Sequence, residues 1–297
     1  MFTGLSAFPL TPLIAGAVDE KGFRKIVARL TAAGVDSMGI LGSTGIYAYL
    51  SREQRNRIAT LAKQLAGDIP VMVCVGATST DAILHLADDA QVAGADALLL
   101  PAVSYHTLRN EEVFALFETV NRCVSVPICV YDNPVTTHFT FSDELHGLLS
   151  ALDRVRSVKI IGVPGRQQAT IERVNTLRRH LQPGVTIGIS GDAYAGPGLN
   201  AGCEVWYSVC AGLFPQTAKQ ITEAAAARDD ARVTALTTRL APLWGLFRKH
   251  GGSLRVMAAA AGVLGLTDPD CLPRPLQPLS ADDIANIARV ITALDLK

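Results

Sequence analysis

Eight short runs of mostly apolar residues recur along the first two thirds of the chain. Successive runs begin roughly 20 to 35 residues apart, which is the spacing of a strand followed by a crossover helix. The apolar residues are largely continuous rather than alternating, a pattern typical of parallel strands covered on both faces. The pattern therefore predicts eight parallel strands, at residues 5–8, 37–41, 71–75, 97–100, 128–131, 155–160, 186–189 and 205–209.

The segments between these runs have the periodicity of helices. Apolar positions share one face in each segment, and Ser51 with Gln54 forms a capping box where one helix should begin. Eight strand–helix units in about 210 residues favour a closed (β/α)₈ TIM barrel over an open sheet. The predicted helices occupy residues 20–33, a segment from 51 onward, and residues 80–93, 111–122, 142–149 and 167–181.

Beyond residue 209 the strand pattern stops and only helical patterns remain. Helices are predicted at residues 214–228, 230–250, 253–264 and 280–294, with a proline-rich stretch before the last of them. We therefore expect an α/β fold in which residues 1–212 form the barrel. Residues 213–297 should pack on it as a C-terminal helical extension of the same structural unit.

Composition narrows the functional class. The 27 basic and 27 acidic residues balance, which disfavours nucleic acid or an acidic membrane surface as a partner. The six cysteines form no CxxC pair, so buried free thiols are expected. The N-terminal sequence lacks the pattern of a signal peptide and no apolar stretch is long enough to span a bilayer. A cytoplasmic protein is the expectation.

The chemistry should lie at the carboxyl ends of the strands, where barrel active sites form. The second run ends in Gly42, Ser43, Thr44 and Gly45. Such a turn can aim backbone N–H groups at a carboxylate and offer two hydroxyls to a proton relay, or it is simply a flexible turn. The fifth run ends in Tyr131, which is either a proton carrier or an aromatic plug of the barrel mouth.

Lys159 is the most informative residue, because it interrupts the apolar sixth run. Burying an unpaired ammonium is costly, so desolvation favours an uncharged amine that can condense with a ketone. The alternatives are a lysine that extends out of the barrel end or pairs with a carboxylate. After the seventh run, Asp192 fits a helix cap better than a substrate contact. The histidines lack metal-site spacing and no GxGxxG motif follows the first strand, so neither a metal nor a dinucleotide cofactor is expected.

Together these motifs resemble the dihydrodipicolinate synthase / N-acetylneuraminate lyase family over essentially the whole chain. The glycine–hydroxyl turn, the tyrosine followed by Asp132, Asn133 and Pro134, and the lysine occur in the family's order and spacing. The opening of the chain and the Ser190–Gly191–Asp192 segment also agree. The resemblance implies class I, pyruvate-dependent aldolases that are usually homotetramers and need no cofactor.

The resemblance also assigns roles to individual residues. Lys159 would form the Schiff base and Tyr131 would carry protons. Ser43 and Thr44, with Gly45, would bind the pyruvate carboxylate and extend the relay. Tyr105 corresponds to a tyrosine that reaches a neighbouring subunit's site. Tyr207, on the eighth strand, is a further candidate for substrate binding.

Several departures from the family pattern concern the second substrate. Ile46 stands where the glycine-rich turn usually continues with Glu, and residues 135–138 lack the arginine that holds a distal carboxylate in the lysine-pathway enzymes. Asp132 replaces the usual Asn, and Ile160 and Ile161 follow the lysine. We therefore expect a lyase that joins or cleaves pyruvate and an aldehyde other than aspartate semialdehyde, through an apolar acceptor pocket. The alternatives are 4-hydroxy-tetrahydrodipicolinate synthase itself and a catalytically silent paralogue that binds a small acid.

Overall fold

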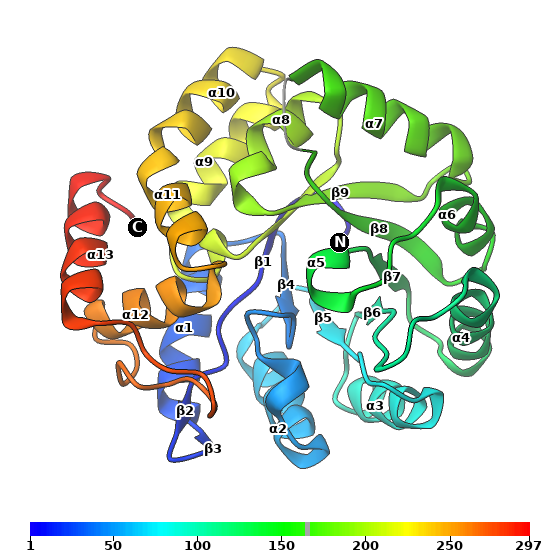
Figure 1. The fold of residues 1–297 in the computed structure, drawn as a ribbon, viewed down its shortest axis with the longest axis horizontal. Coiled ribbons are helices and arrows are strands. Elements are labelled where there is room, and N and C mark those ends of the chain that lie inside the picture. The colour runs from blue at the N-terminus through cyan, green and yellow to red at the C-terminus, as the bar shows by residue number, and fades with distance from the viewer. Residues whose placement is uncertain (164–166) are drawn as a thin grey trace.

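The computed structural model describes residues 1–163 and 167–297 of the chain. Arg166 follows the sixth predicted strand and is a candidate to replace the arginine that residues 135–138 lack. It lies outside the described residues. In the described part, eight parallel strands close into a barrel in the order β1-β10-β9-β8-β7-β6-β5-β4. Figure 1 shows these strands at the centre of the molecule with helices around them. The strands are β1 Gly4–Ala7, β4 Ser37–Ile40, β5 Val71–Cys74, β6 Ala97–Pro101, β7 Ile128–Tyr131, β8 Val155–Ile161, β9 Thr186–Ser190 and β10 Val205–Ser208. The predicted barrel is confirmed, with every strand within about two residues of its expected bounds.

The helices of the first seven units surround the barrel and begin near the predicted residues. The capping box of Ser51 and Gln54 is present at the start of α2. These helices are α1 Glu20–Ala33, α2 Arg52–Leu65, α3 Thr80–Val92, α4 Asn110–Cys123, α6 Asp143–Ser150 and α7 Gln167–His180, together with the short α5 Pro134–Thr137 and α8 Ala195–Asn200. The two short helices were not predicted, because four to six residues carry too little periodicity. The same holds for the hairpin of β2 Leu13–Ile14 and β3 Ala17–Val18.

The C-terminal helices lie on one side of the barrel in Figure 1. The first of them, α9 Pro215–Ala226, packs on β1 and α1 and so completes the ring of helices. The expected boundary at residue 212 therefore falls between the last strand and its helix. The helices beyond the ring are α10 Asp230–Arg239, α11 Ala241–Lys249, α12 Leu254–Val263 and α13 Ala281–Ala293.

The predicted single helix over residues 230–250 is wrong. The chain leaves helical geometry at Leu240, with φ −82° and ψ 3°, and restarts as α11 with Pro242 in its first turn. Proline lacks the N–H that a continuous helix needs and clashes with the preceding turn, whereas the first turn of a new helix tolerates it.

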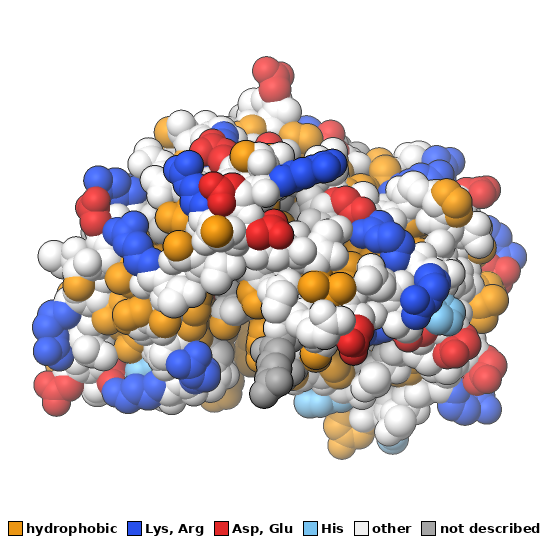
Figure 2. Space-filling view, turned by 90° about the horizontal axis from the view of Figure 1, so that it is seen from above, with side chains coloured by type: hydrophobic (Ala, Val, Ile, Leu, Met, Phe, Trp, Pro, Cys, Tyr) orange, Lys and Arg blue, Asp and Glu red, His pale blue; other side chains and the backbone are white. Residues whose placement is uncertain are grey.

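The surface is consistent with the balanced charge of the chain. On the face shown in Figure 2, basic and acidic side chains are interspersed, with apolar side chains between them. Within the described residues, no helix is both long and apolar enough to cross a membrane.

Candidate active site

Strands β7 and β8 bring Lys159 and Tyr131 together at the carboxyl end of the barrel. The two residues are direct partners in the parallel register of these strands. Their side chains point into the barrel, because Lys159 Nζ lies 4.1 Å from the centre of the Tyr131 ring. The sequence placed these residues on neighbouring strands, and the register confirms that they lie side by side.

Lys159 is enclosed by aromatic rings. Only 6% of the residue is exposed. Besides Tyr131, its Nζ lies 4.4 Å from the centre of the Phe8 ring and 6.0 Å from that of Tyr207. Ring faces attract a cation but offer no acceptor lone pair. Among the described residues, no carboxylate lies within ion-pair distance of this amine. Burial and the absence of such a pair fit neither alternative explanation, extension into solvent or pairing with a carboxylate.

Tyr131 is buried and hydrogen-bonded at its phenol. It is 1% exposed, and its OH lies 3.1 Å from Ser43 Oγ. Asn133 Nδ2 donates to the same oxygen at 3.2 Å. Burial opposes ionisation, but the charge of Lys159 and the hydrogen bonds together hold the pKa of Tyr131 below its usual value. The phenol is therefore suited to exchange a proton with a neighbour.

The turn after β4 carries Ser43 to this phenol. A Cβ at Gly45 would lie 2.7 Å from the backbone N of Leu41, so only glycine fits there. Ile46 follows with φ +54°, a left-handed conformation that β-branched residues rarely adopt. Thr44 is 4% exposed beside Ser43. The turn is thus tightly constrained, and it directs one hydroxyl at Tyr131.

Tyr207 also enters the barrel, but its hydroxyl points elsewhere. It lies 2.6 Å from Ser157 Oγ, and Cys129 Sγ donates to it at 3.4 Å. Thr186 Oγ1 in turn donates to Ser157 Oγ at 2.9 Å. These residues join four neighbouring strands on the amino-terminal side of Lys159. Substrate binding by Tyr207 stays a prediction, and its contacts favour a packing role beneath the amine.

Two other candidates lie apart from this cluster. Tyr105 is 92% exposed and its ring packs edge-on against His106, so the chain alone does not bring it to Lys159. The Asp192 carboxylate accepts hydrogen bonds from Trp206 Nε1 at 3.0 Å and from the backbone N of Cys210 at 2.7 Å. The expectation that it caps the helix following its own strand is therefore wrong. It holds the segment after β10 instead, and burial raises its pKa to about 6.

Sequence reasoning missed the roles of Phe8 and Asn133. Phe8 covers Lys159, and a Cβ at Gly39 would lie 2.3 Å from its ring, so the glycine of β4 makes room for it. Asn133 was noted only as a displaced family residue. A phenylalanine just after the first strand and an amide two positions after the tyrosine were the available signals.

The fold and the site together define a (β/α)₈-barrel protein whose candidate active site contains a buried lysine and a hydrogen-bonded phenol at the carboxyl ends of the strands. The model of the dihydrodipicolinate synthetase family matches residues 1–294. The chain belongs to this family, which is a family of lyases.

Relatives and solved structures agree with this membership. A 4-hydroxy-tetrahydrodipicolinate synthase from Desulfotalea psychrophila is 27% identical over 99% of this chain and 97% of its own length. The crystal structure of dihydrodipicolinate synthase from Agrobacterium tumefaciens matches with a TM-score of 0.94 at 43% identity, covering 99% of this chain and 98% of that one. The Acinetobacter baumannii dihydrodipicolinate synthase complexed with pyruvate has a TM-score of 0.90 and covers 100% of both chains. At 22% identity it shares the fold alone.

Proposed function

We propose that the protein is a Schiff-base lyase that joins pyruvate, or a closely related 2-oxo acid, to an aldehyde or cleaves the product of that addition. The observation that carries the proposal is the register pair of Lys159 and Tyr131, with Ser43 hydrogen-bonded to the phenol. A buried amine beside a phenol of lowered pKa supports amine–carbonyl chemistry. The pyruvate bound by the Acinetobacter relative supports this choice of acid.

The reaction would begin with attack of the uncharged Lys159 Nζ on C2 of the acid. Water leaves and an iminium forms, and its positive charge acidifies the C3–H bond. Loss of that proton gives an enamine, which adds to the aldehyde carbon. The aldehyde oxygen takes up a proton and water then releases the product from the lysine. Tyr131 stands where it can exchange protons with these groups, with Ser43 and Thr44 beside it.

The acceptor aldehyde is proposed to be other than aspartate semialdehyde. Val135, in the stretch that lacks arginine, is 72% exposed. A bidentate arginine–carboxylate pair would supply charge-assisted selectivity that this stretch does not offer. Ile46 and Ile160 are 1% and 3% exposed, as buried as Tyr131, so their burial neither assigns them to an apolar acceptor wall nor excludes them from it. The acceptor proposal therefore rests on the missing arginine.

The main alternative is 4-hydroxy-tetrahydrodipicolinate synthase, which the names of several relatives favour. A steady-state comparison of aspartate semialdehyde with an uncharged aldehyde distinguishes the two. We expect the uncharged aldehyde to be turned over faster. A kcat/KM for aspartate semialdehyde at or above about 10⁴ M⁻¹s⁻¹, the low end of the usual enzyme range, establishes the lysine-pathway activity instead. Assembly into a homotetramer, with Tyr105 completing a neighbour's site, remains part of the proposal.

Borohydride trapping tests the chemistry without knowledge of the aldehyde. The protein is incubated with pyruvate and borohydride, and the reduced adduct is mapped by mass spectrometry. In a parallel sample in D₂O, loss of the pyruvate methyl signal in the ¹H NMR spectrum reports enamine formation. We expect an adduct on Lys159 and catalysed exchange at C3. Binding of pyruvate without an adduct identifies a silent acid-binding paralogue, and an adduct on another lysine refutes the assignment.

A further inference from the structure

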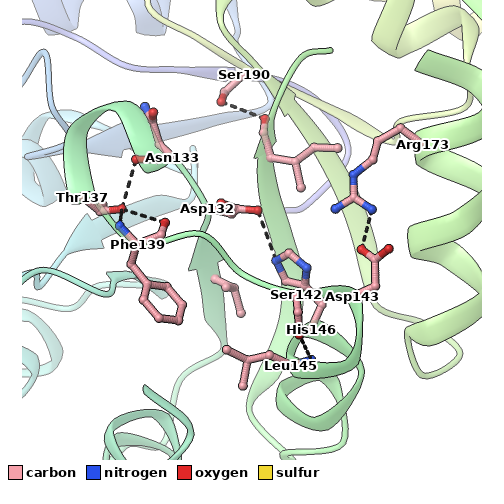
Figure 3. A network of polar contacts seen from close by, with 12 residues as sticks. Asp132, Asn133, Thr137, Phe139, Ser142, Asp143, Leu145, His146, Arg173 and Ser190 are labelled. Atoms are coloured by element: carbon pink, nitrogen blue, oxygen red, sulfur yellow. Dashed lines mark hydrogen bonds and ion pairs between the residues drawn. The ribbon is translucent and has the colours of Figure 1, made fainter. Parts of the chain in front are cut away.

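A buried carboxyl–imidazole pair lies behind the strand that carries Tyr131. Asp132 follows Tyr131 directly, and its backbone N donates to the carbonyl O of Lys159 at 2.9 Å. Its side chain leaves the barrel interior and points at His146 of α6, as Figure 3 shows. Asp132 Oδ2 lies 3.4 Å from His146 Nε2. Asp132 is 8% exposed and His146 is 0% exposed.

Neither residue of the pair has another protein partner among the described residues. Asp132 Oδ1 and both ring nitrogens of His146 are buried without a hydrogen bond, and Nε2 has only the 3.4 Å approach of Asp132 Oδ2. The separation of 3.4 Å is long for a hydrogen bond, so the two groups face each other at the limit of contact. The imidazole ring is held by stacking on Phe141, with ring centres 5.1 Å apart.

The charged groups around the pair come from three elements. Arg173 of α7 is paired with Asp143 of α6, so each is already neutralised by the other. His180 of α7 also acts on the imidazole, and Lys159 of β8 lies on the interior side of the strand. Arg173 and Asp143 act on the pKa of Asp132 in opposite directions, so their effects partly cancel.

Burial acts in opposite directions on the two groups. It raises the pKa of Asp132 to about 7 and lowers the pKa of His146 to about 4. Between about pH 4 and 7 the pair therefore holds one proton, and that proton resides on the carboxyl. The pair is then uncharged, and the carboxyl O–H can donate to His146 Nε2. Sharing this one proton would give Asp132 Oδ2 and His146 Nε2 a partner that neither finds elsewhere.

Resting on the proposed function, we propose that Asp132 and His146 are positioning residues for Tyr131, and that their uncharged, one-proton state holds the reactive end of β7 in place. Asp132 is the link between two residues that meet at the phenol oxygen, since Tyr131 precedes it and Asn133 donates to Tyr131 OH at 3.2 Å. The carbonyl O of Asn133 in turn accepts from Thr137 Oγ1 at 3.0 Å. Displacement of Asp132 would therefore move both the phenol and its donor.

Loss of the shared proton would leave a single negative charge buried at this strand end. An unpaired buried charge is unfavourable, so the segment would shift to expose it. We expect C3 exchange of pyruvate to slow as the pH rises through neutrality. Asp132→Asn cannot ionise, yet its amide can still donate to His146 Nε2, so it should keep the exchange rate over this range.

The pair also has a signature in folding stability. In the unfolded chain the carboxyl and the imidazole have pKa values of about 3.9 and 6.5. Between about pH 4 and 6.5 both states therefore hold one proton, on the imidazole when unfolded and on the carboxyl when folded. Above pH 6.5 only the folded state still holds it, so the free energy of unfolding should fall as the pH rises through about 7. Asp132→Asn should lack this decrease.

The experiment compares wild type with Asp132→Asn, Asp132→Ala and the control Asp143→Asn, which removes a neighbouring carboxylate but leaves the pair intact. Pyruvate C3 exchange is measured from pH 6 to 9 and gives kcat and KM. We expect Asp132→Ala to lose about 10- to 100-fold in kcat, the usual consequence of a small misplacement, with KM changed less than about threefold. Asp132→Asn should recover the rate at pH 6. Asp143→Asn should keep the wild-type kcat at pH 6 but show the decrease in rate at lower pH than wild type, because Arg173 without its partner lowers the pKa of Asp132.

The outcomes separate this inference from the proposed function. If wild type forms no trapped adduct, both fail, because no reaction remains to be positioned. If wild type forms the adduct but Asp132→Asn and Asp132→Ala keep its kcat and pH profile, the positioning role alone is refuted. Should Asp132→Ala not fold, the pH profiles of exchange and of stability in Asp132→Asn decide the matter.

Discussion

The pKa values of two buried phenols in the same barrel are shifted in opposite directions. Tyr131 and Tyr207 are 1% and 2% exposed, so desolvation acts on both. The pKa of Tyr207 is raised well above its usual value by burial and by the ionisable sulfur of Cys129 beside it. Against the same burial, Lys159 and two hydrogen bonds lower the pKa of Tyr131. Neighbouring groups rather than burial therefore separate a candidate proton carrier from a packing residue.

The hydroxyls of the two phenols bind to different parts of the barrel, Tyr131 to Ser43 and Tyr207 to Ser157. The amine is 4.1 Å from the Tyr131 ring centre and 6.0 Å from that of Tyr207. On the Tyr131 side the hydroxyls belong to turns at the strand ends, where a substrate can arrive. On the Tyr207 side they lie within strands and hydrogen-bond to each other. The barrel thus has two layers beside Lys159. The reactive layer contains Tyr131 with Ser43 and Asn133, and the structural layer contains Tyr207 with Ser157 and Thr186.

Removal of the amine should have the largest effect. Lys159→Met has a similar shape and no nucleophile, so we expect no pyruvate adduct and no C3 exchange above background. Because the variant also removes a buried amine that has no ion-pair partner among the described residues, it should fold at least as stably as wild type. Mass spectrometry after borohydride and thermal unfolding check both points. An adduct at wild-type yield would place the reactive amine elsewhere.

The phenol variants should differ sharply from each other. Tyr131→Phe should slow C3 exchange on the order of 10²- to 10⁴-fold, the usual contribution of a positioned acid or base. Tyr207→Phe should slow it less than about tenfold, because its hydroxyl contacts only structural groups in the barrel and leaves Ser157 with a Thr186 partner. Exchange rates at saturating pyruvate measure both. Equal losses in the two variants would contradict the division into two layers.

The structural layer should respond to added volume. A Cβ at Gly188 would lie 2.1 Å from the Tyr207 ring, so Gly188→Ala should lower the free energy of unfolding by about 1–3 kcal/mol. Gly245→Ala is the matched control, since its Cβ would meet only Arg248, at 3.8 Å, and alanine favours the helix. Urea denaturation measures the free energy of unfolding of both variants and of wild type. If Gly188→Ala leaves the free energy of unfolding unchanged, then Tyr207 is loosely packed and the structural layer is not rigid.

The sequence predicted those features that leave a local trace. Continuous apolar runs marked the strands, and Lys159 was conspicuous because a charge interrupts one of them. The direction of the Tyr207 hydroxyl left no such trace, since it depends on barrel closure and on strands 50 residues apart in sequence. The Asp132–His146 pair likewise arises only when α6 packs behind β7. Tyr105 shows the converse case, in which a resemblance names a residue whose contacts a single chain cannot supply.

The smallest expected effect concerns the free energy of unfolding at alkaline pH. Replacing Tyr131 and replacing Tyr207 by phenylalanine should change it in opposite directions. An unfolded tyrosine ionises near about pH 10. The folded pKa of Tyr131 is lower, so between that value and pH 10 the unfolded state binds more protons and Tyr131 adds stability as the pH rises. The folded pKa of Tyr207 is higher, so above pH 10 the folded state retains its proton and stability falls with pH. Relative to wild type, Tyr131→Phe should therefore lose stability as the pH rises toward 10, and Tyr207→Phe should gain it above pH 10. Differences between variant and wild type cancel the buried thiols that lie apart from the two phenols, but the Cys129 thiol contacts Tyr207 and its change belongs to the Tyr207→Phe difference. Denaturant unfolding at several pH values measures the two differences, and shifts of the same sign would show that both phenols share one environment.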